Sequence, residues 1–472
     1  MSAEIAPIPQ AHQSVIPGKE LDYAKYEITH GKYQWTLTTL QAGKDNFSVS
    51  ASGGDNTIFT LAPKVYNFAK SYLKFRLVPS AGGADYFNRL FLDGFTPIRQ
   101  IQLYTQSGLF LADIPDFHKY TNMVFRRSFK INDVMTWNKE GELFEGLSCI
   151  NKTATDGQRI YDDATAGTGM VKTSFLEPMY ISSGGSGKNA SGPIIDIQLC
   201  LGKIVNSIFS LDKDLYFGGE NILLKIIWNQ SDKIGWIVKD VGKTTTDAAA
   251  FPGNYTISRL ALYMAIEVNP VIENMLKTKT ESPEGFNLII PFIHMNKMSS
   301  IGTGQTLTTT YSRSNGSKLM KIYWAPYLGK ENGATAYDHN NKANRIIQNF
   351  YTSINNTRLS QFNYNCDGDD YREQKLKLRG SCILSADEYY YNWVWIEDFT
   401  NNYSMVDKPI SPPEDNYIDG LPLDIDQKYD IIPTTVDPTL IAPPGSQTAY
   451  ENYIYAVCQR LLVVTTRGIS LV

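Results

Sequence analysis

The segment closest to a known chemical motif is Ser182 to Asn189, which reads SSGGSGKN. A phosphate-binding P-loop needs a glycine five residues before the glycine of its Gly-Lys pair. It also needs a serine or threonine after the lysine, because that hydroxyl binds Mg²⁺. Here Ser182 and Asn189 occupy those two positions, so the motif fails at both ends. The segment is interpreted as a flexible Gly/Ser linker.

Two groups of carboxylates could bind a cation or cleave a glycoside. The cluster Asp367, Asp369 and Asp370 suits a hard cation such as Ca²⁺, but the twelve-residue spacing with a closing glutamate is missing. An acidic turn is the favoured interpretation. The second group spans Glu414 to Asp430, where no spacing selects an acid and a base, so a solvated loop is expected. Its carboxylates are Glu414, Asp415, Asp419, Asp424, Asp426 and Asp430.

Histidines and cysteines also form no recognisable centre. The sequence contains no HExxH, GxSxG or CxxC pattern. We therefore assign no catalytic residue, no metal ligand and no cofactor, and we expect the chain not to be an enzyme. The cysteines are expected to be free, mostly buried thiols. The residues concerned are His12, His30, His118, His294, His339, Cys149, Cys200, Cys366, Cys382 and Cys458.

Composition and charge exclude several classes of protein. With 472 residues and 42% hydrophobic residues, the chain can bury a core in two or more domains. The net charge of -4 supplies no basic field that would hold nucleic acid. Residues 1–20 show no pattern of a signal peptide, and no apolar stretch reaches the ~18–20 residues of a membrane helix. A soluble protein made inside a cell is expected.

Alternating residues point to strands in both halves of the chain. In Tyr72 to Val78, every second side chain is apolar, which is typical of a half-buried strand. The longest such run is Ile257 to Val268, which Pro270 ends. Together with the abundance of Tyr, Phe, Gly and Pro, these runs predict an all-β fold. Further segments of this kind are Arg99 to Tyr104, Ile194 to Leu201, Lys318 to Trp324 and Tyr453 to Val464.

Helical spacing is rare. Ile114, Phe117, Thr121 and Val124 recur every three or four residues after Asp113, which would be the N-cap. A second short helix is predicted from Ile346, Ile347 and Phe350. Strands and helices do not alternate regularly, which argues against a parallel sheet with a nucleotide site.

A polar segment with two prolines, Asn269 to Gly285, divides the chain. We expect an N-terminal arm at 1–44, a first β-sandwich at 45–270, a linker at 271–285 and a second β-sandwich at 286–472. Each sandwich carries long turn-rich insertions, which commonly form interaction surfaces. These insertions are Asn151 to Gly192, Lys239 to Asn254, Gly329 to Lys342 and Lys408 to Thr448.

The order of segments also resembles that of a known family. Residues Asp55 to Ser128 contain the successive segments YLKFRL, PIRQIQLY and SGLFLADI, followed by a helix. The second half adds NFYTSINNTRLSQ at Asn349 to Gln361, DFTNNYSMVDKPIS at Asp398 to Ser411 and a closing strand. This layout resembles the double jelly-roll major capsid proteins of tailless icosahedral DNA viruses, the lineage of adenoviruses, tectiviruses, virophages and polinton-like viruses.

The resemblance implies two consecutive eight-stranded antiparallel jelly rolls in one chain. It further implies a homotrimer that forms a pseudo-hexagonal capsomer and tiles an icosahedral virion shell. Expected partners are neighbouring capsomers, penton proteins, minor capsid or cement proteins and, under the shell, an internal membrane. Residues 1–20 contain only Lys19 as a cation, so no sequence-specific contact with nucleic acid is expected.

Two other functions remain open on the residues alone. A two-domain glycan-binding or adhesion protein could stack sugars on Tyr389 to Trp395, YYYNWVW, although alternating aromatics more often form a buried strand or a packed interface. A glycosidase could use carboxylates of Glu414 to Asp430, but no pair is identifiable. A structural shell protein needs no active site, which agrees with the missing motifs.

Overall fold

The computed structural model describes most of the strands of the chain and the segments that join them. The described residues are 33–38, 40–42, 45–50, 54–79, 86–90, 97–128, 149–151, 170–172, 180–181, 197–230, 235–239, 248–250, 255–298, 306–328, 347–365, 393–400, 420–435 and 450–472.

The first half of the chain forms two facing antiparallel sheets. One sheet has the order β1-β17-β5-β12, and the other has the order β4-β14-β7-β8 with β2 at its edge. The strands are β1 (Tyr33–Leu37), β2 (Leu40–Ala42), β4 (Asn56–Leu61), β5 (Val65–Pro79), β7 (Ile98–Thr105), β8 (Phe110–Ile114), β12 (Ile197–Cys200), β14 (Ile222–Trp228) and β17 (Tyr255–Glu267). Two short strands, β3 (Phe47–Val49) and β13 (Leu215–Tyr216), pair with β17 and β5.

The second half repeats this arrangement. Its sheets have the orders β18-β26-β20-β23 and β19-β25-β21-β22. The strands are β18 (Phe286–Met298), β19 (Leu307–Tyr311), β20 (Lys318–Leu328), β21 (Ile347–Ile354), β22 (Thr357–Arg358), β23 (Trp395–Asp398), β25 (Gln427–Thr435) and β26 (Tyr450–Thr465). The short strands β24 (Leu421–Pro422) and β27 (Gly468–Leu471) pair with β20 and β26.

Both sandwiches share one topology. When the eight main strands of each are numbered along the chain, one sheet has the order 1-8-3-6 and the other 2-7-4-5. This exchange of strands between two sheets is the jelly-roll arrangement. The predicted all-β fold with two consecutive eight-stranded jelly rolls is therefore confirmed. The accessory strands correspond too, because β13 pairs with the third strand of the first jelly roll and β24 with the third strand of the second.

The predicted strands follow from their alternation. In β5, Leu73, Phe75 and Leu77 are buried, while Lys74 and Arg76 on the other face are half-buried. Side chains on a strand point alternately to the two faces of the sheet, so one apolar face is enough to specify such a strand. The predicted segments around β7, β12, β17, β20 and β26 are strands as well.

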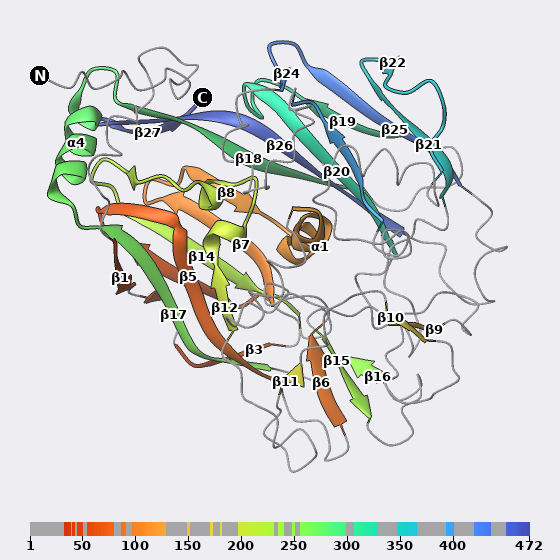
Figure 1. Ribbon diagram of the computed structural model, residues 1–472, viewed down its shortest axis with the longest axis horizontal. Helices are drawn as coiled ribbons and strands as arrows, with labels where there is room; N and C mark the ends of the chain where they lie inside the picture. Colours follow the sequence, from red (N-terminus) through yellow and green to blue (C-terminus); the bar gives the residue numbers. More distant parts are fainter. Residues whose placement is uncertain are drawn as a thin grey trace, which may run out of the picture.

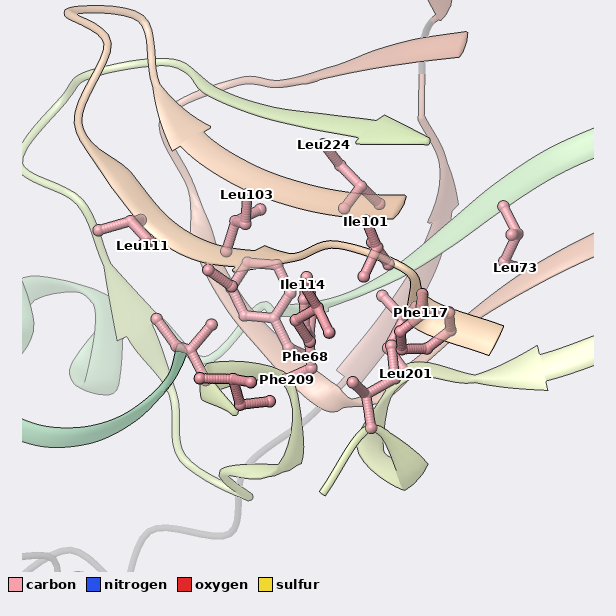
Figure 2. Close-up of a cluster of buried hydrophobic side chains, with 14 of the residues drawn as sticks. Phe68, Leu73, Ile101, Leu103, Leu111, Ile114, Phe117, Leu201, Phe209 and Leu224 are labelled. Carbon is pink, nitrogen blue, oxygen red and sulfur yellow. The ribbon is translucent and has the colours of Figure 1, made fainter. Parts of the chain in front are cut away.

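Each jelly roll has its own interior. Figure 2 shows the interior of the first, where Phe68 and Phe209 make an edge-to-face contact with ring centroids 5.8 Å apart. The interior of the second is richer in large aromatic rings. There Trp324 lies edge to face against Trp393, with centroids 5.1 Å apart, and Phe350 lies against Trp395 at 4.9 Å. Such ring pairs contribute about 0.5–1.5 kcal/mol beyond the area they bury.

The first predicted helix exists but starts later than expected. Helix α1 spans Phe117–Ser128, and Asp113 lies in β8, so its predicted role as N-cap is wrong. The Asp113 carboxylate instead accepts hydrogen bonds from the side-chain amides of Gln100 (2.7 Å) and Gln102 (3.1 Å) on β7. Pairing with β7 keeps the chain extended up to Ile114.

The second predicted helix is wrong, because Ile347 and Phe350 lie in strand β21. A bulge between Ile347 and Asn349 inserts one extra residue into the pairing of β21 with β25. Two residues three positions apart can then face the same interior, and both side chains are buried in the second jelly roll. The bulge therefore imitates helical spacing in the sequence.

The regions expected as linker and arm also contain regular structure. Helix α4 (Pro270–Glu281) occupies most of 271–285, with the Asn269 side chain accepting a hydrogen bond from the backbone N–H of Val271 at 3.0 Å. In Figure 1, α4 lies at one end of the molecule, beside β27. Within the expected arm at 1–44, β1 and β2 pair into the two sheets of the first jelly roll.

The insertions of the first jelly roll contribute a small separate sheet. Its order is β11-β6-β15-β16, and it lies at the lower end of the view in Figure 1. Its strands are β6 (Tyr86–Leu90), β11 (Tyr180–Ile181), β15 (Gly235–Lys239) and β16 (Ala248–Ala250), and β9 (Cys149–Asn151) pairs with β10 (Met170–Lys172). Neither α1, α4 nor any other helix in the described ranges is long and apolar enough to cross a membrane.

Candidate functional site at the junction of the two jelly rolls

The sheet β18-β26-β20-β23 is buried on both faces. On β20, Ile322 and Trp324 belong to the interior of the second jelly roll, whereas Tyr323, Ala325 and Tyr327 pack against the first. The same alternation runs along β26 and β23. The side chains that face the first jelly roll include Met320, Val394, Ile396, Tyr453, Tyr455 and Val457. This sheet is a shared layer, and we call its contact with the first jelly roll the junction.

Helix α1 is one of the elements that the first jelly roll places on this layer, and Figure 1 shows it between the two jelly rolls. Phe117, Tyr120 and Val124 recur at helical spacing and are fully buried. The ring of Tyr120 packs edge-on against Tyr455, with centroids 5.3 Å apart. The helix therefore carries an apolar face to the junction.

Tyrosine hydroxyls hydrogen-bond across the junction. The Tyr455 hydroxyl donates to the backbone carbonyls of Pro115 (3.2 Å) and Asp116 (3.0 Å), which precede α1. The Tyr327 hydroxyl donates to the side-chain carbonyl of Asn122 on α1 at 2.7 Å. Because a buried polar group without a partner costs about 1–3 kcal/mol, these bonds fix one relative position of the two jelly rolls.

A single asparagine ties three elements together. Asn206 lies between β12 and β14 with a positive φ of 57°, a conformation that asparagine tolerates better than most residues. Its side-chain NH₂ donates to the hydroxyls of Tyr120 and Tyr323, both at 3.2 Å. It therefore links α1 of the first jelly roll to β20 of the second.

One buried cation lies at the edge of the junction. The Lys119 ammonium sits 4.1 Å from the centre of the Tyr327 ring and 5.9 Å from that of Tyr453. Glu451 accepts the Tyr453 hydroxyl at 3.0 Å and forms an ion pair with Lys297 at 2.9 Å. Burial acts to raise the pKa of Glu451, but the hydrogen bond and charge of Lys297 outweigh it and hold this pKa below its ordinary value.

The polar groups at the junction hold the two jelly rolls in a fixed position. Burial raises the pKa of Tyr455 well above its ordinary value, so its hydroxyl stays protonated and keeps donating. Among the described residues, no group of three or more His, Cys, Asp or Glu side chains could hold a metal ion. The arrangement holds the two jelly rolls as one unit.

The motifs singled out in the sequence fall mostly elsewhere. Ser182 to Asn189, the cluster Asp367 to Asp370, Cys366 and Cys382 lie outside the described residues. Within the acidic tract, Asp424 is exposed and lies 3.6 Å from Arg313. Asp430 is buried beside Lys428 and accepts the hydroxyl of Thr308. His294 lies on β18, where its Nε2 is 2.8 Å from the Asn315 carbonyl oxygen. Among the described residues, Asp424, Asp430 and His294 form no common cluster.

The aromatic segment proposed as a sugar platform is packed inside the protein. Trp393 and Trp395 are fully buried and stack into the interior of the second jelly roll. Between them, Val394 faces the junction. The interpretation as a packed, buried segment rather than a glycan platform is confirmed for these three residues, of which only Trp395 lies in a strand, β23. Tyr389 to Asn392 lie outside the described part of the chain.

The residues of the junction were not identified from the sequence. A signal was nevertheless present, because Tyr453 to Val457 reads YIYAV and Tyr323 to Tyr327 reads YWAPY. Both runs overlap segments expected to alternate like β5, but neither run places a charged residue on either face. Continuous apolar strands are typical of sheets buried on both faces.

Comparison with known proteins identifies the fold. No family model and no curated protein matches the sequence. Among solved structures, the chain is similar to the PBCV-1 virus capsid, with 9% sequence identity, a TM-score of 0.53 and coverage of 94% of this chain and 97% of the other. It is also similar to a chain of the Sputnik virophage, with 10% identity, a TM-score of 0.50 and coverage of 100% and 92%. The likeness therefore spans both jelly rolls.

Proposed function

We propose that this chain, which has the double jelly-roll fold of viral capsid proteins, is a major capsid protein, the structural subunit of an icosahedral virion shell. The observation that carries the proposal is the repeated strand order 1-8-3-6 and 2-7-4-5 in two jelly rolls fixed to one another. A shell subunit needs a rigid body with large surfaces for contact between copies, and the junction supplies such a body.

The proposal includes the way the subunit assembles. Three chains form a homotrimer that acts as a pseudo-hexagonal capsomer, and capsomers contact each other, penton proteins and minor capsid or cement proteins. The inner side of the shell faces an internal membrane where the virion has one. The chain has no enzymatic role and does not read nucleic-acid sequence, in keeping with its net charge of -4.

Light scattering of the purified chain over a range of concentrations tests this function. The mass of one chain is 53.0 kDa, so a trimer has a mass of about 159 kDa. We expect this species to persist on dilution, because a closed oligomer with extensive interfaces dissociates only at very low concentration. A stable monomer that binds glycans on an array would instead support the glycan-binding alternative.

A further inference from the structure

The outward face of the sheet β1-β17-β5-β12 carries a row of apolar side chains. Leu37, Tyr263, Tyr72 and Cys200 are directly opposed on the four successive strands, so they share one face. The rings of Tyr72 and Tyr263 stack with centroids 4.9 Å apart. Leu37 is 61% exposed, and Trp35, two residues earlier on the same face, is 50% exposed.

The second jelly roll has an equivalent row of side chains, and the first jelly roll covers it. Met295, Tyr455, Tyr323 and Ile396 are directly opposed on β18, β26, β20 and β23, which are the equivalent strands in the same order. This row contains the corresponding pair of tyrosines. All four side chains pack against the first jelly roll. A face that is buried in the second jelly roll is thus partly exposed in the first.

The hydroxyl groups differ in the same way. Tyr455 and Tyr323 each hydrogen-bond to the first jelly roll. Within the described part of the chain, the hydroxyls of Tyr72 and Tyr263 have no hydrogen-bond partner. The row on the first jelly roll therefore has the apolar surface and the hydroxyl groups needed to bind segments like those that cover the row on the second jelly roll.

The segments that cover the second row also have counterparts. In the first jelly roll, the cover consists of the segment after the fifth main strand, which leads into α1, and of residues between the sixth and seventh strands, such as Asn206. In the second jelly roll, the equivalent segments follow β22 and precede β25. These segments expose Leu359 (43%), Phe362 (58%) and Ile425 (74%). Five of the nine exposed large hydrophobic residues of the described chain thus lie either on the outward face of β1 or in these two segments.

We propose that the row Leu37, Tyr263, Tyr72 and Cys200 binds the second jelly roll of another copy of this chain, through its Leu359, Phe362 and Ile425. The contact between copies then repeats the junction within one chain. It joins two different surfaces, so it is head-to-tail and can close into a ring. This inference rests on the proposed function and identifies the surface that would hold the capsomer together.

The first test introduces a charge into the row Leu37, Tyr263, Tyr72 and Cys200, which we call the open row. Leu37→Arg places a cation on the outward face, and Gln34→Arg places one on the other face of the same exposed edge strand, as a matched control. We expect the mass of Leu37→Arg to fall from about 159 kDa to about 53 kDa, with an unchanged circular dichroism spectrum. Gln34→Arg should keep the wild-type mass. A wild-type mass for Leu37→Arg would overturn the proposed surface but leave the trimer intact, whereas a monomeric wild type would overturn both.

The second test identifies what covers the row in the otherwise native chain. A photo-reactive benzoylphenylalanine replaces Tyr72, and cross-linked peptides are mapped by mass spectrometry. We expect links between copies, to peptides that contain Leu359 to Phe362 or Ile425. Links to the same face of another copy would overturn the proposal, because they indicate a symmetric face-to-face contact. Links to residues 1–32 of the same chain would overturn it as well.

Discussion

The sheets β18-β26-β20-β23 and β1-β17-β5-β12 have the same strand order and very different surroundings. The outward tyrosines of the former, Tyr323 and Tyr455, are buried at the junction, whereas Tyr72 and Tyr263 of the latter remain half-exposed. The strand order alone does not decide which face of a sheet is buried. The neighbouring structure decides it, and among the described residues only the sheet of the second jelly roll has such a neighbour on its outward face.

The largest effect is expected from truncating one tyrosine of each pair. Tyr455→Ala should lower the free energy of unfolding by about 3–5 kcal/mol, because it empties a packed aromatic site and removes bonds to two carbonyls. Tyr263→Ala is the matched variant in the open row and should cost about 1 kcal/mol or less in a separated chain. Urea denaturation of both variants in the Leu37→Arg background measures the difference. Equal losses would remove the distinction between the two faces.

The next prediction compares two glycines with positive φ, each of which precedes a strand. Gly285 precedes β18 with φ 69°, and a Cβ there would lie 2.6 Å from the Val464 carbonyl oxygen. Gly219 precedes β14 with φ 89° and has open space around it. Gly285→Ala should lower the free energy of unfolding by about 2–4 kcal/mol, and Gly219→Ala by about 1–2 kcal/mol. Thermal denaturation checks the order, and a smaller loss for Gly285→Ala would contradict the close approach.

Two lysines of the first jelly roll also lie over tyrosine rings, one at the junction and one away from it. Lys119 is buried over Tyr327 at 4.1 Å, while Lys70 is partly exposed over Tyr33 at 4.5 Å. Cation–π contacts are worth about 2 kcal/mol when desolvated and about 0.5–1 kcal/mol when exposed. Lys119→Met should therefore destabilise the protein more than Lys70→Met in urea denaturation. The reverse order would argue that the junction does not desolvate this cation.

A last contrast between the jelly rolls is the pH dependence that His294 gives to the second. Burial lowers the pKa of His294 to about 4, whereas Thr36 stands at the equivalent position of β1. The folded state keeps His294 neutral and the unfolded state protonates it near pH 6.5, so the unfolded state binds more protons in between. The stability should consequently fall as the pH drops from about 6.5 towards about 4. His294→Gln should weaken this dependence in denaturation curves recorded across that range, and an unchanged slope would exclude His294 as its source.

The sequence predicts the strands with one polar face far better than it predicts the junction. Leu73, Phe75 and Leu77 specify β5 because their alternation has one physical meaning. The bulge beside Asn349 makes a strand resemble a helix in the sequence, because it lets Ile347 and Phe350, three residues apart, face the same interior. Pairing partners such as Tyr327 and Asn122 are 205 residues apart, and no local pattern connects them. The apolar runs of β20 and β26 indicate burial on both faces but do not identify the neighbour.

The equivalence of the two tyrosine pairs is tested most directly by hydroxyl-radical footprinting of the native chain. Reactivity is read residue by residue at Tyr72, Tyr263, Tyr323 and Tyr455 in the wild type and in Leu37→Arg. We predict that all four are protected in the wild-type oligomer, and that only Tyr72 and Tyr263 become reactive in the variant. Reactive Tyr72 and Tyr263 in an intact wild-type oligomer would contradict the account, because the open row would then face solvent rather than a second copy.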